Sequence, residues 1–292
     1  MFTKLTDTSK ATIFTVLVLF MAMAVALLFK VGGLTSEGPV IGLYMCTPAL
    51  AALVMLLVIT RDGSSREGWK SLGLHRLGLR VWWIAIGVIF LTSLVASAIV
   101  WATPLASFVL SEGGIVNPLL QFLTGVVIMT LTFSLGEELG WRGYLLPRLL
   151  SVGRTRALVL VGLIWAAWHM PLIFLTPLYH SSGNRLIVLP LFVGTLVAAS
   201  FVFGYLRILT GSVWPASLAH SVHNVAWSTL AALTATSSPV AVNEYLAGDN
   251  GILILAATAV VAVWLGRKVS RTVGSDPSKP QPRIASGEAP AV

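Results

Sequence analysis

Charged residues are scarce in this 292-residue chain: Asp, Glu, Lys and Arg make up 10% of it, whereas hydrophobic residues make up 56%. Soluble domains carry about 25% charged residues, so a water-soluble globular protein is excluded. Cysteine is almost absent as well. The single residue, Cys46, excludes a disulfide within the chain and a metal site built from cysteines. With a mean hydropathy of +0.88, the sequence predicts a membrane protein with several spans.

The sequence contains eight apolar segments separated by polar stretches. Most of these segments reach the length of about 20 residues that crosses about 30 Å of hydrocarbon as a helix. The last segment is shorter than the others. The predicted fold class is therefore all-α, a polytopic membrane helix bundle with about eight transmembrane helices. The expected spans are residues 11–29, 39–60, 81–101, 118–136, 157–176, 186–206, 213–233 and 251–266.

The basic residues predict how these helices are oriented. If the amino terminus lies inside, all but Lys30 and Arg185 of the 19 Lys and Arg residues fall on the inner side, as the positive-inside rule requires. The net charge of +8 is then explained by topology and by contact with anionic lipid, so no nucleic-acid partner is implied. We expect both termini in the cytoplasm, and the plasma (inner) membrane of a prokaryote as the location.

The segment LGEELGWRGYLLP at 135–147 places ionisable residues next to an apolar span. In a helix, Glu138 and Arg142 lie one turn apart on one face and can form an ion pair. Glu137 is rotated by about 100° and points elsewhere. Charges in so apolar a span either mark a functional site that faces the bundle interior or cap a membrane helix at the interface. Both interpretations stay open on this segment alone.

Other polar residues at membrane depth are His169 in WAAWHMPL, and His220, His223 and Asn224 in ASLAHSVHN. Singly, each is explained by helix packing, and His223 lies off the face that His220 and Asn224 share. Together with Glu137 they suit chemistry. A carboxylate and an imidazole that face one water make a general base, and a second imidazole with an amide supplies donors to an oxyanion. We expect these groups to meet in the inner half of the bilayer.

Three motifs in this order resemble those of the CPBP family, the type II CAAX prenyl endopeptidases and bacteriocin-processing (Abi) membrane proteins. They are EExxxR; FxxxH, here WAAWH; and HxxxN. Trp165 stands where Phe is usual in the second motif, which puts the local packing in question. The residues that match are Glu137, Glu138, Arg142, His169, His220 and Asn224.

The resemblance implies an integral-membrane endopeptidase that hydrolyses a peptide bond at or near the inner membrane face. By this resemblance, Glu137 and His169 activate the water, and His220 and Asn224 stabilise the oxyanion. The implied partners are the lipid bilayer and a membrane-associated peptide or protein substrate, which in this family can be lipid-modified.

The resemblance also implies that Glu138 and Arg142 shape the site as an ion pair. The expected cofactor is none or Zn²⁺. The metal motif HExxH is absent, but Glu137, His169 and His220 offer the three ligands that a catalytic zinc site needs. A metal-free mechanism is the favoured expectation.

Four parts follow along the chain. Residues 1–116 hold about three transmembrane helices and a basic inner loop, 61–80, which is either an interfacial amphipathic element or a solvated loop. Residues 117–233 form the expected catalytic helix core. Residues 234–266 contain the last transmembrane helix, and residues 267–292, rich in Pro, Ser and Gly, are expected to be a disordered basic tail.

Two other functions fit part of this pattern. One is a non-catalytic immunity or partner protein of the membrane with the same fold. The other is a proton-coupled transporter, because buried Glu and His residues also serve as proton relays. Against transport, the sequence shows no repeated pair of broken helices of the kind that inverted-repeat carriers have.

Overall fold

The computed structural model describes residues 5–32, 37–110 and 113–273, and this part of the chain is almost entirely helical. Within it, seven helical stretches are long and apolar enough to cross a membrane, so the predicted all-α polytopic bundle is confirmed. These stretches are Asp7–Gly32, Gly38–Ile59, Leu79–Trp101, Val116–Val152, Arg154–Leu175, Arg185–Thr210 and Ile252–Thr272.

The predicted span 213–233 is also a helix, α10 (Trp214–Ala232), although it is not among these seven. His220, His223 and Asn224 lower its hydropathy. The helix packs against α4, α5 and α9, so other helices surround much of it. Buried neighbours can satisfy polar side chains that lipid cannot.

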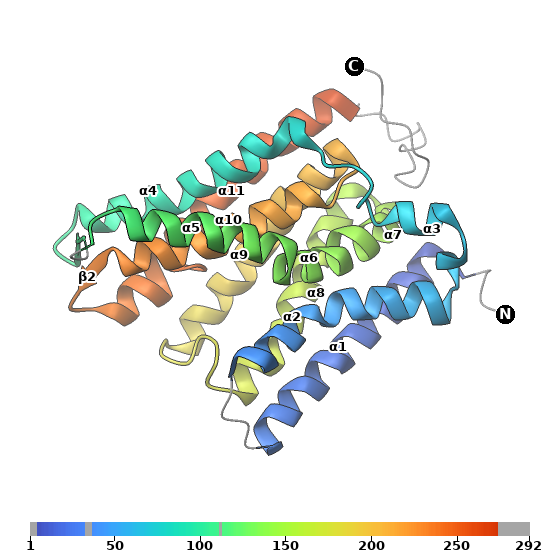
Figure 1. Ribbon diagram of the computed structural model, residues 1–292, viewed down its shortest axis with the longest axis horizontal. Coiled ribbons are helices and arrows are strands. Elements are labelled where there is room, and N and C mark those ends of the chain that lie inside the picture. Colours follow the sequence, from blue (N-terminus) through green and yellow to red (C-terminus); the bar gives the residue numbers. More distant parts are fainter. Residues whose placement is uncertain (1–4, 33–36, 111–112, 274–292) are drawn as a thin grey trace.

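The helices pack as neighbours that lie far apart in the sequence (Figure 1). Helix α9 (Arg185–Thr210) packs against α8 (Arg154–Leu175) and α11 (Ile252–Val273). Helix α11 continues to Val273, beyond the predicted end at 266, and the rest of the predicted tail lies outside the described residues. Helix α10 packs against α5 (Val116–Leu131) and α4 (Ile89–Trp101).

Helices α1 (Asp7–Gly32) and α2 (Glu37–Val54) pack against each other, and α1 also packs against α8. The shorter elements are η1 (Met55–Ile59), η2 (Asp62–Ser64), α3 (Arg66–Ser71), η3 (Leu79–Val81), η4 (Ile84–Val88), α6 (Phe133–Glu138), η5 (Leu139–Leu145), α7 (Leu146–Leu149), η6 (Leu150–Val152) and η7 (Ala241–Leu246). Strands β1 (Ala106–Phe108) and β2 (Thr234–Thr236) form an antiparallel pair with Ala106 opposite Thr236.

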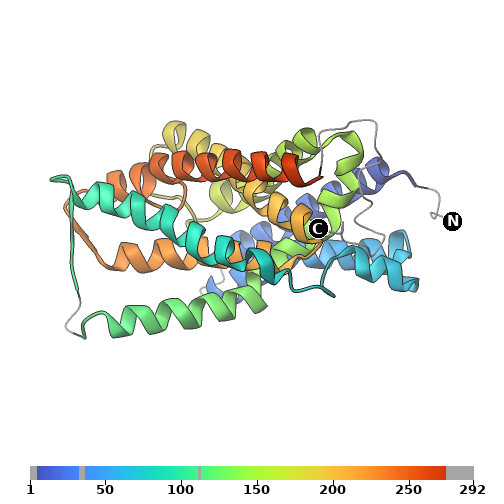
Figure 2. The same cartoon turned by 90° about the horizontal axis from the view of Figure 1, so that it is seen from above.

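The helices run between two ends of the molecule (Figures 1 and 2). One end carries the start of α1, the end of α11, α3 and α7, and the opposite end carries the β1–β2 pair (Figure 1). The described chain therefore begins and ends on the side of the basic loop 61–80, as an even number of crossings requires.

This arrangement makes a topology prediction. Reporter fusions at Ser182 and at the carboxyl terminus are expected to lie on opposite sides of the membrane, because the connection 176–184 follows the end of α8 that lies away from the basic loop. A phosphatase and a fluorescent-protein reporter, each active on one side only, measure this. Two fusions on the same side would contradict the eight-helix path.

The fourth span differs most from the prediction. Helix α5 ends at Leu131, where Thr132 leaves helical geometry with φ −123° and ψ −96°, and α6 and η5 then continue the chain. Glu137 is 2% exposed and Glu138 is fully buried, so the interpretation of these carboxylates as interfacial caps is wrong. Gly140 allows this segment to approach α2, because a Cβ there would overlap Pro48.

Three arginines that the sequence assigned to the inner surface are internal. Arg142 and Arg207 are fully buried, and Arg148 is 7% exposed. Arg207 Nε donates to the carbonyl of Arg142 (3.0 Å), and its Nη2 donates to that of Ser71 (2.7 Å). Arg207 therefore ties the loop 61–80 to the interior of the bundle. Gly73, with φ +80°, leaves the space that the Arg207 guanidinium fills.

Candidate active site

A cavity of about 270 Å³ lies among α2, α6, α8, α9 and α10, and all four side chains that the sequence proposed for catalysis line it: Glu137, His169, His220 and Asn224. They come from three separate helices. The structure therefore brings together the residues that the three motifs single out. A concave, mostly apolar cavity with a few convergent polar groups is the usual form of a ligand-binding or active site.

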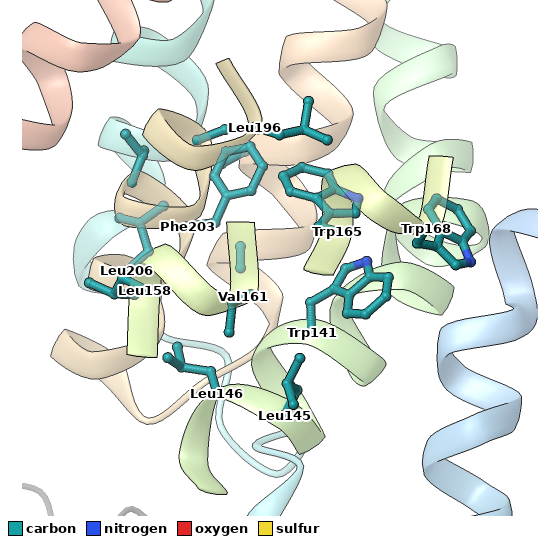
Figure 3. Packing of buried hydrophobic residues seen from close by; sticks show 14 of the residues in the cluster. Trp141, Leu145, Leu146, Leu158, Val161, Trp165, Trp168, Leu196, Phe203 and Leu206 are labelled. Atoms are coloured by element: carbon teal, nitrogen blue, oxygen red, sulfur yellow. The ribbon is translucent and has the colours of Figure 1, made fainter. Parts of the chain in front are cut away.

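Glu137 is held by two indole groups. Its Oε2 accepts hydrogen bonds from Trp165 Nε1 at 2.8 Å and, with a longer distance of 3.4 Å, from Trp141 Nε1. The two tryptophans lie side by side in Figure 3, one from η5 and one from α8. Among the described residues nothing donates to Oε1, so this oxygen is available to a water in the cavity.

Trp165 is the residue whose role the sequence did not predict. The Trp in place of Phe put only the local packing in question, whereas the structure shows an N–H donor to Glu137 that Phe cannot supply. Its ring also lies under the Arg142 guanidinium, 4.7 Å from centroid to Cζ, and 5.3 Å from the His220 ring. The departure from the family motif is thus a chemical change in the site.

The Glu138–Arg142 ion pair forms as the four-residue spacing predicted, and it also contacts His220. Glu138 Oε1 accepts from Arg142 Nη1 at 2.7 Å, and both side chains are fully buried. The same oxygen lies 3.1 Å from His220 Nδ1. A carboxylate accepts, so Nδ1 of His220 carries a proton and Nε2 is left for the cavity. Such a partner fixes the orientation of an imidazole.

His169 is oriented in a similar way. Its Nδ1 lies 2.9 Å from the carbonyl of Trp165, which can only accept, so Nδ1 is protonated and Nε2 of the neutral ring has a free lone pair. The ring also contacts Phe192, with centroids 5.1 Å apart. The sequence placed the site in the inner half of the bilayer, but His169 lies closer to the opposite end of α8.

The sequence did not predict several other residues that line the cavity. Asn224 lies one turn after His220 as expected, but His223, which the helical face argument ranked lowest, lines the cavity too. Tyr179, Asp249 and Asn250 reach the cavity from the connections before α9 and α11. No periodicity marks residues in such connections, because only the packing of distant segments brings them together.

The proposed zinc ligands do not fit a metal site. In the part of the chain that the structure describes, no three His, Cys, Asp or Glu side chains are close enough to bind one ion, and this includes Glu137, His169 and His220. A catalytic zinc needs three converging protein ligands, and these side chains do not supply them.

Residues 117–226 match a protein-family model described as "Type II CAAX prenyl endopeptidase Rce1-like", and this range contains every motif residue. A curated relative, CAAX prenyl protease 2 of Methanococcus maripaludis, is 41% identical over 56 residues, which are 19% of this chain and 21% of the relative. The chain therefore covers about a fifth of the length of that relative. These matches confirm the resemblance to the CPBP family that the motifs predicted.

Proposed function

We propose that this chain, whose residues 117–226 match the type II CAAX prenyl endopeptidase family, is an integral-membrane peptidase that uses Glu137 to activate water. The observation that carries the proposal is the position of Glu137. Its carboxylate is buried and fixed by two indole donors, yet it lines a cavity that His169, His220 and Asn224 also line. A buried charge with no ion-pair partner of its own is costly, and chemistry is a reason to retain it.

The proposed reaction begins with a water bound to Oε1 of Glu137 and to Nε2 of His169. Glu137 takes one proton, and the hydroxide oxygen bonds to the carbonyl carbon of the scissile peptide bond. The C–N bond then breaks, and the proton on Glu137 passes to the leaving nitrogen. The products are a carboxylic acid and an amine, so the atoms of one water are fully accounted for.

His220 and Asn224 are the proposed donors to the oxyanion. The amide of Asn224 donates in its neutral state, whereas His220 can donate from Nε2 only as an imidazolium, because Nδ1 already carries the proton that faces Glu138. Glu138 and Arg142 are proposed as the residues that hold His220 in this orientation.

The proposed substrate is a membrane-associated peptide or protein of the CAAX type, which carries a lipid near its cleavage site. The bilayer is the second partner. We place residues 117–233 at the centre of this function, in a prokaryotic plasma membrane with both termini in the cytoplasm. Cleavage is placed toward the cytoplasmic face because His220 lies near the end of α10 that contacts the basic loop, although His169 lies nearer the opposite end of α8. Apolar side chains such as Leu172 and Leu196 line the cavity and suit an apolar substrate.

The test is hydrolysis of a farnesylated CAAX peptide by the purified protein in bilayer discs, compared with Glu137→Gln protein. Release of the carboxyl-terminal tripeptide, followed by mass spectrometry, is the readout. An immunity protein or a transporter shows no release with either protein. The variant therefore discriminates the peptidase from both alternatives.

Replacing Trp165 by Phe is expected to change the pH dependence of cleavage. Phe keeps the ring but removes the 2.8 Å donor to Glu137, so the carboxylate is less stabilised and a higher pH is needed to ionise it. A hydrogen bond to a charged group is worth about 1.5–3 kcal/mol, and one pH unit corresponds to about 1.4 kcal/mol. The acidic limb of the pH profile of kcat/KM should therefore move to higher pH by about one unit or more.

The matched control is Trp83→Phe, since Trp83 is 56% exposed and lies outside the cavity. Its profile should coincide with that of the parent. A Trp165→Phe profile with an unmoved acidic limb would show that the indole N–H does not act on Glu137.

A further inference from the structure

A second set of polar side chains lies at the same cavity and takes no part in the proposed reaction. Tyr179, Asp249 and Asn250 line the cavity from the connections that precede α9 and α11. His180 and Glu244 lie behind them, since His180 Nδ1 is 2.7 Å from Glu244 Oε2. Five polar residues from two distant connections thus converge at or behind one end of the cavity.

The donor and the acceptor of each hydrogen bond in this set can be assigned. The Tyr179 hydroxyl donates to Asp249 Oδ2 at 2.7 Å. Burial, together with the neighbouring Asp249 carboxylate, raises the pKa of Tyr179 well above its ordinary value, so this proton stays in place. Because that proton is used, the Tyr179 oxygen accepts from Asn250 Nδ2 at 3.1 Å.

The remaining donors are used as well. Asn250 Nδ2 also lies 3.3 Å from His180 Nε2, which accepts, because Nδ1 of this ring donates to the Glu244 carboxylate. Every N–H and O–H of these side chains is therefore directed at another member of the set. Only acceptors are left over.

Two acceptor oxygens remain without a full complement of donors. Asn250 is 3% exposed, and its Oδ1 has no hydrogen-bond partner among the described residues, which is unfavourable for a buried polar atom. Asp249 Oδ1 is 4.0 Å from His180 Nε2, too far for a hydrogen bond. An unpartnered buried acceptor beside a carboxylate is the complement of a donor that carries positive charge.

The protein supplies no such cation here. No lysine or arginine of the described chain lines the cavity. His223 lines the same cavity from α10, and among the described residues no hydrogen bond joins its side chain to the Asp249 carboxylate. The walls next to the polar set are apolar, with Leu178, Leu172 and Leu196. The cavity thus has apolar walls and, at one end, hydrogen-bond acceptors that lack a donor.

We propose that Asp249 and Asn250 form a subsite for an ammonium or guanidinium group on an apolar stem. If the proposed peptidase function holds, on which this identification rests, the occupant is a basic side chain of the substrate peptide. The alkyl stem of a lysine or arginine packs along the apolar walls. Its charged end then donates to the Asp249 carboxylate and to Asn250 Oδ1.

Binding of two small probes tests the subsite without any cleavage. The probes are n-hexylammonium and n-hexanol, which share the stem and differ in charge, and binding is measured by calorimetry with the protein in phosphatidylcholine discs. The wild-type protein should bind hexylammonium at least about tenfold more tightly, and Asp249→Asn should lose this preference. Glu67→Gln removes an exposed carboxylate on α3 and should keep it.

Equal affinity of the wild-type protein for both probes would overturn the subsite, and so would a preference that survives in Asp249→Asn. Equal affinity for both probes is measured on the wild-type protein alone. The proposal can therefore be overturned even if the Asp249→Asn protein does not fold. If the wild-type protein prefers hexylammonium and the Asp249→Asn protein does not, but no peptide is cleaved, the subsite stands and the peptidase function fails.

A quenched-peptide series identifies the source of the charge. Peptides with one Lys at successive positions are compared with norleucine counterparts, with the amino terminus free or acetylated. At one position the ratio of kcat/KM for Lys over norleucine should be about ten and should fall to about one in Asp249→Asn. A ratio near one at every position in the wild-type protein would exclude a basic side chain. Loss of cleavage on acetylation alone would instead assign the subsite to the terminal amine.

Discussion

Glu137→Gln is expected to reduce cleavage by at least about 10²–10⁴, the range that a positioned general base contributes. Glutamine has the same shape, and its carbonyl oxygen still accepts from Trp165 and Trp141. It cannot take a proton from water, so the loss reports on chemistry and not on packing. The measurement is kcat/KM on a farnesylated CAAX peptide, with unfolding followed in parallel to show that the fold is kept.

Glu67→Gln is the control, because it makes the same change on the exposed surface of α3 and should retain full activity. Asn224→Ala tests a second residue of the site. It removes one oxyanion donor, so it should lose about 10²–10³ in kcat with KM little changed. If Glu137→Gln cleaves within tenfold of the parent, Glu137 is not the base and the proposed mechanism is wrong.

Arg142→Ala is expected to destabilise the folded protein by about 3–5 kcal/mol, the cost of leaving one member of a buried ion pair uncompensated. Both Arg142 and Glu138 are fully buried, with Nη1 and Oε1 2.7 Å apart. The change also removes the guanidinium that packs on Trp165 and Phe203. Unfolding in mixed micelles with a denaturing detergent measures the difference.

The double variant Glu138→Gln with Arg142→Met removes both charges and should recover part of the loss, since no unpaired charge then remains. Arg66→Ala, on the exposed face of α3, serves as the control and should change stability by less than about 0.5 kcal/mol. If Arg142→Ala is as stable as the parent, the pair does not support the fold.

The sequence by itself determined the fold class. Long apolar runs with few charges leave the backbone no option in lipid other than helices whose hydrogen bonds are internal. The spacing of Glu138 and Arg142 also determined their pairing, because residues four apart share a helix face. Both features depend on local composition or on one helical turn, so no knowledge of the packing is needed.

The sequence could not predict where the fourth span breaks or which charges are internal. Thr132 carries no strong breaking signal, yet the helix ends there and Glu137 enters the core. Arg207 follows an apolar run like any residue of an inner loop. Only its contacts with two distant carbonyls show that it is buried.

Tertiary structure alone decided what surrounds the carboxylate of Glu137 and what lies at the far end of its cavity. Trp165 is distant in sequence from Glu137, and Tyr179 and Asp249 come from separate connections. Hydrogen bonds act over about 3 Å, whereas sequence patterns report periodicity within one element. A contact between elements is fixed only when helix packing brings them within that distance, and here this packing sets both the donors to Glu137 and the acceptors left on Asp249 and Asn250.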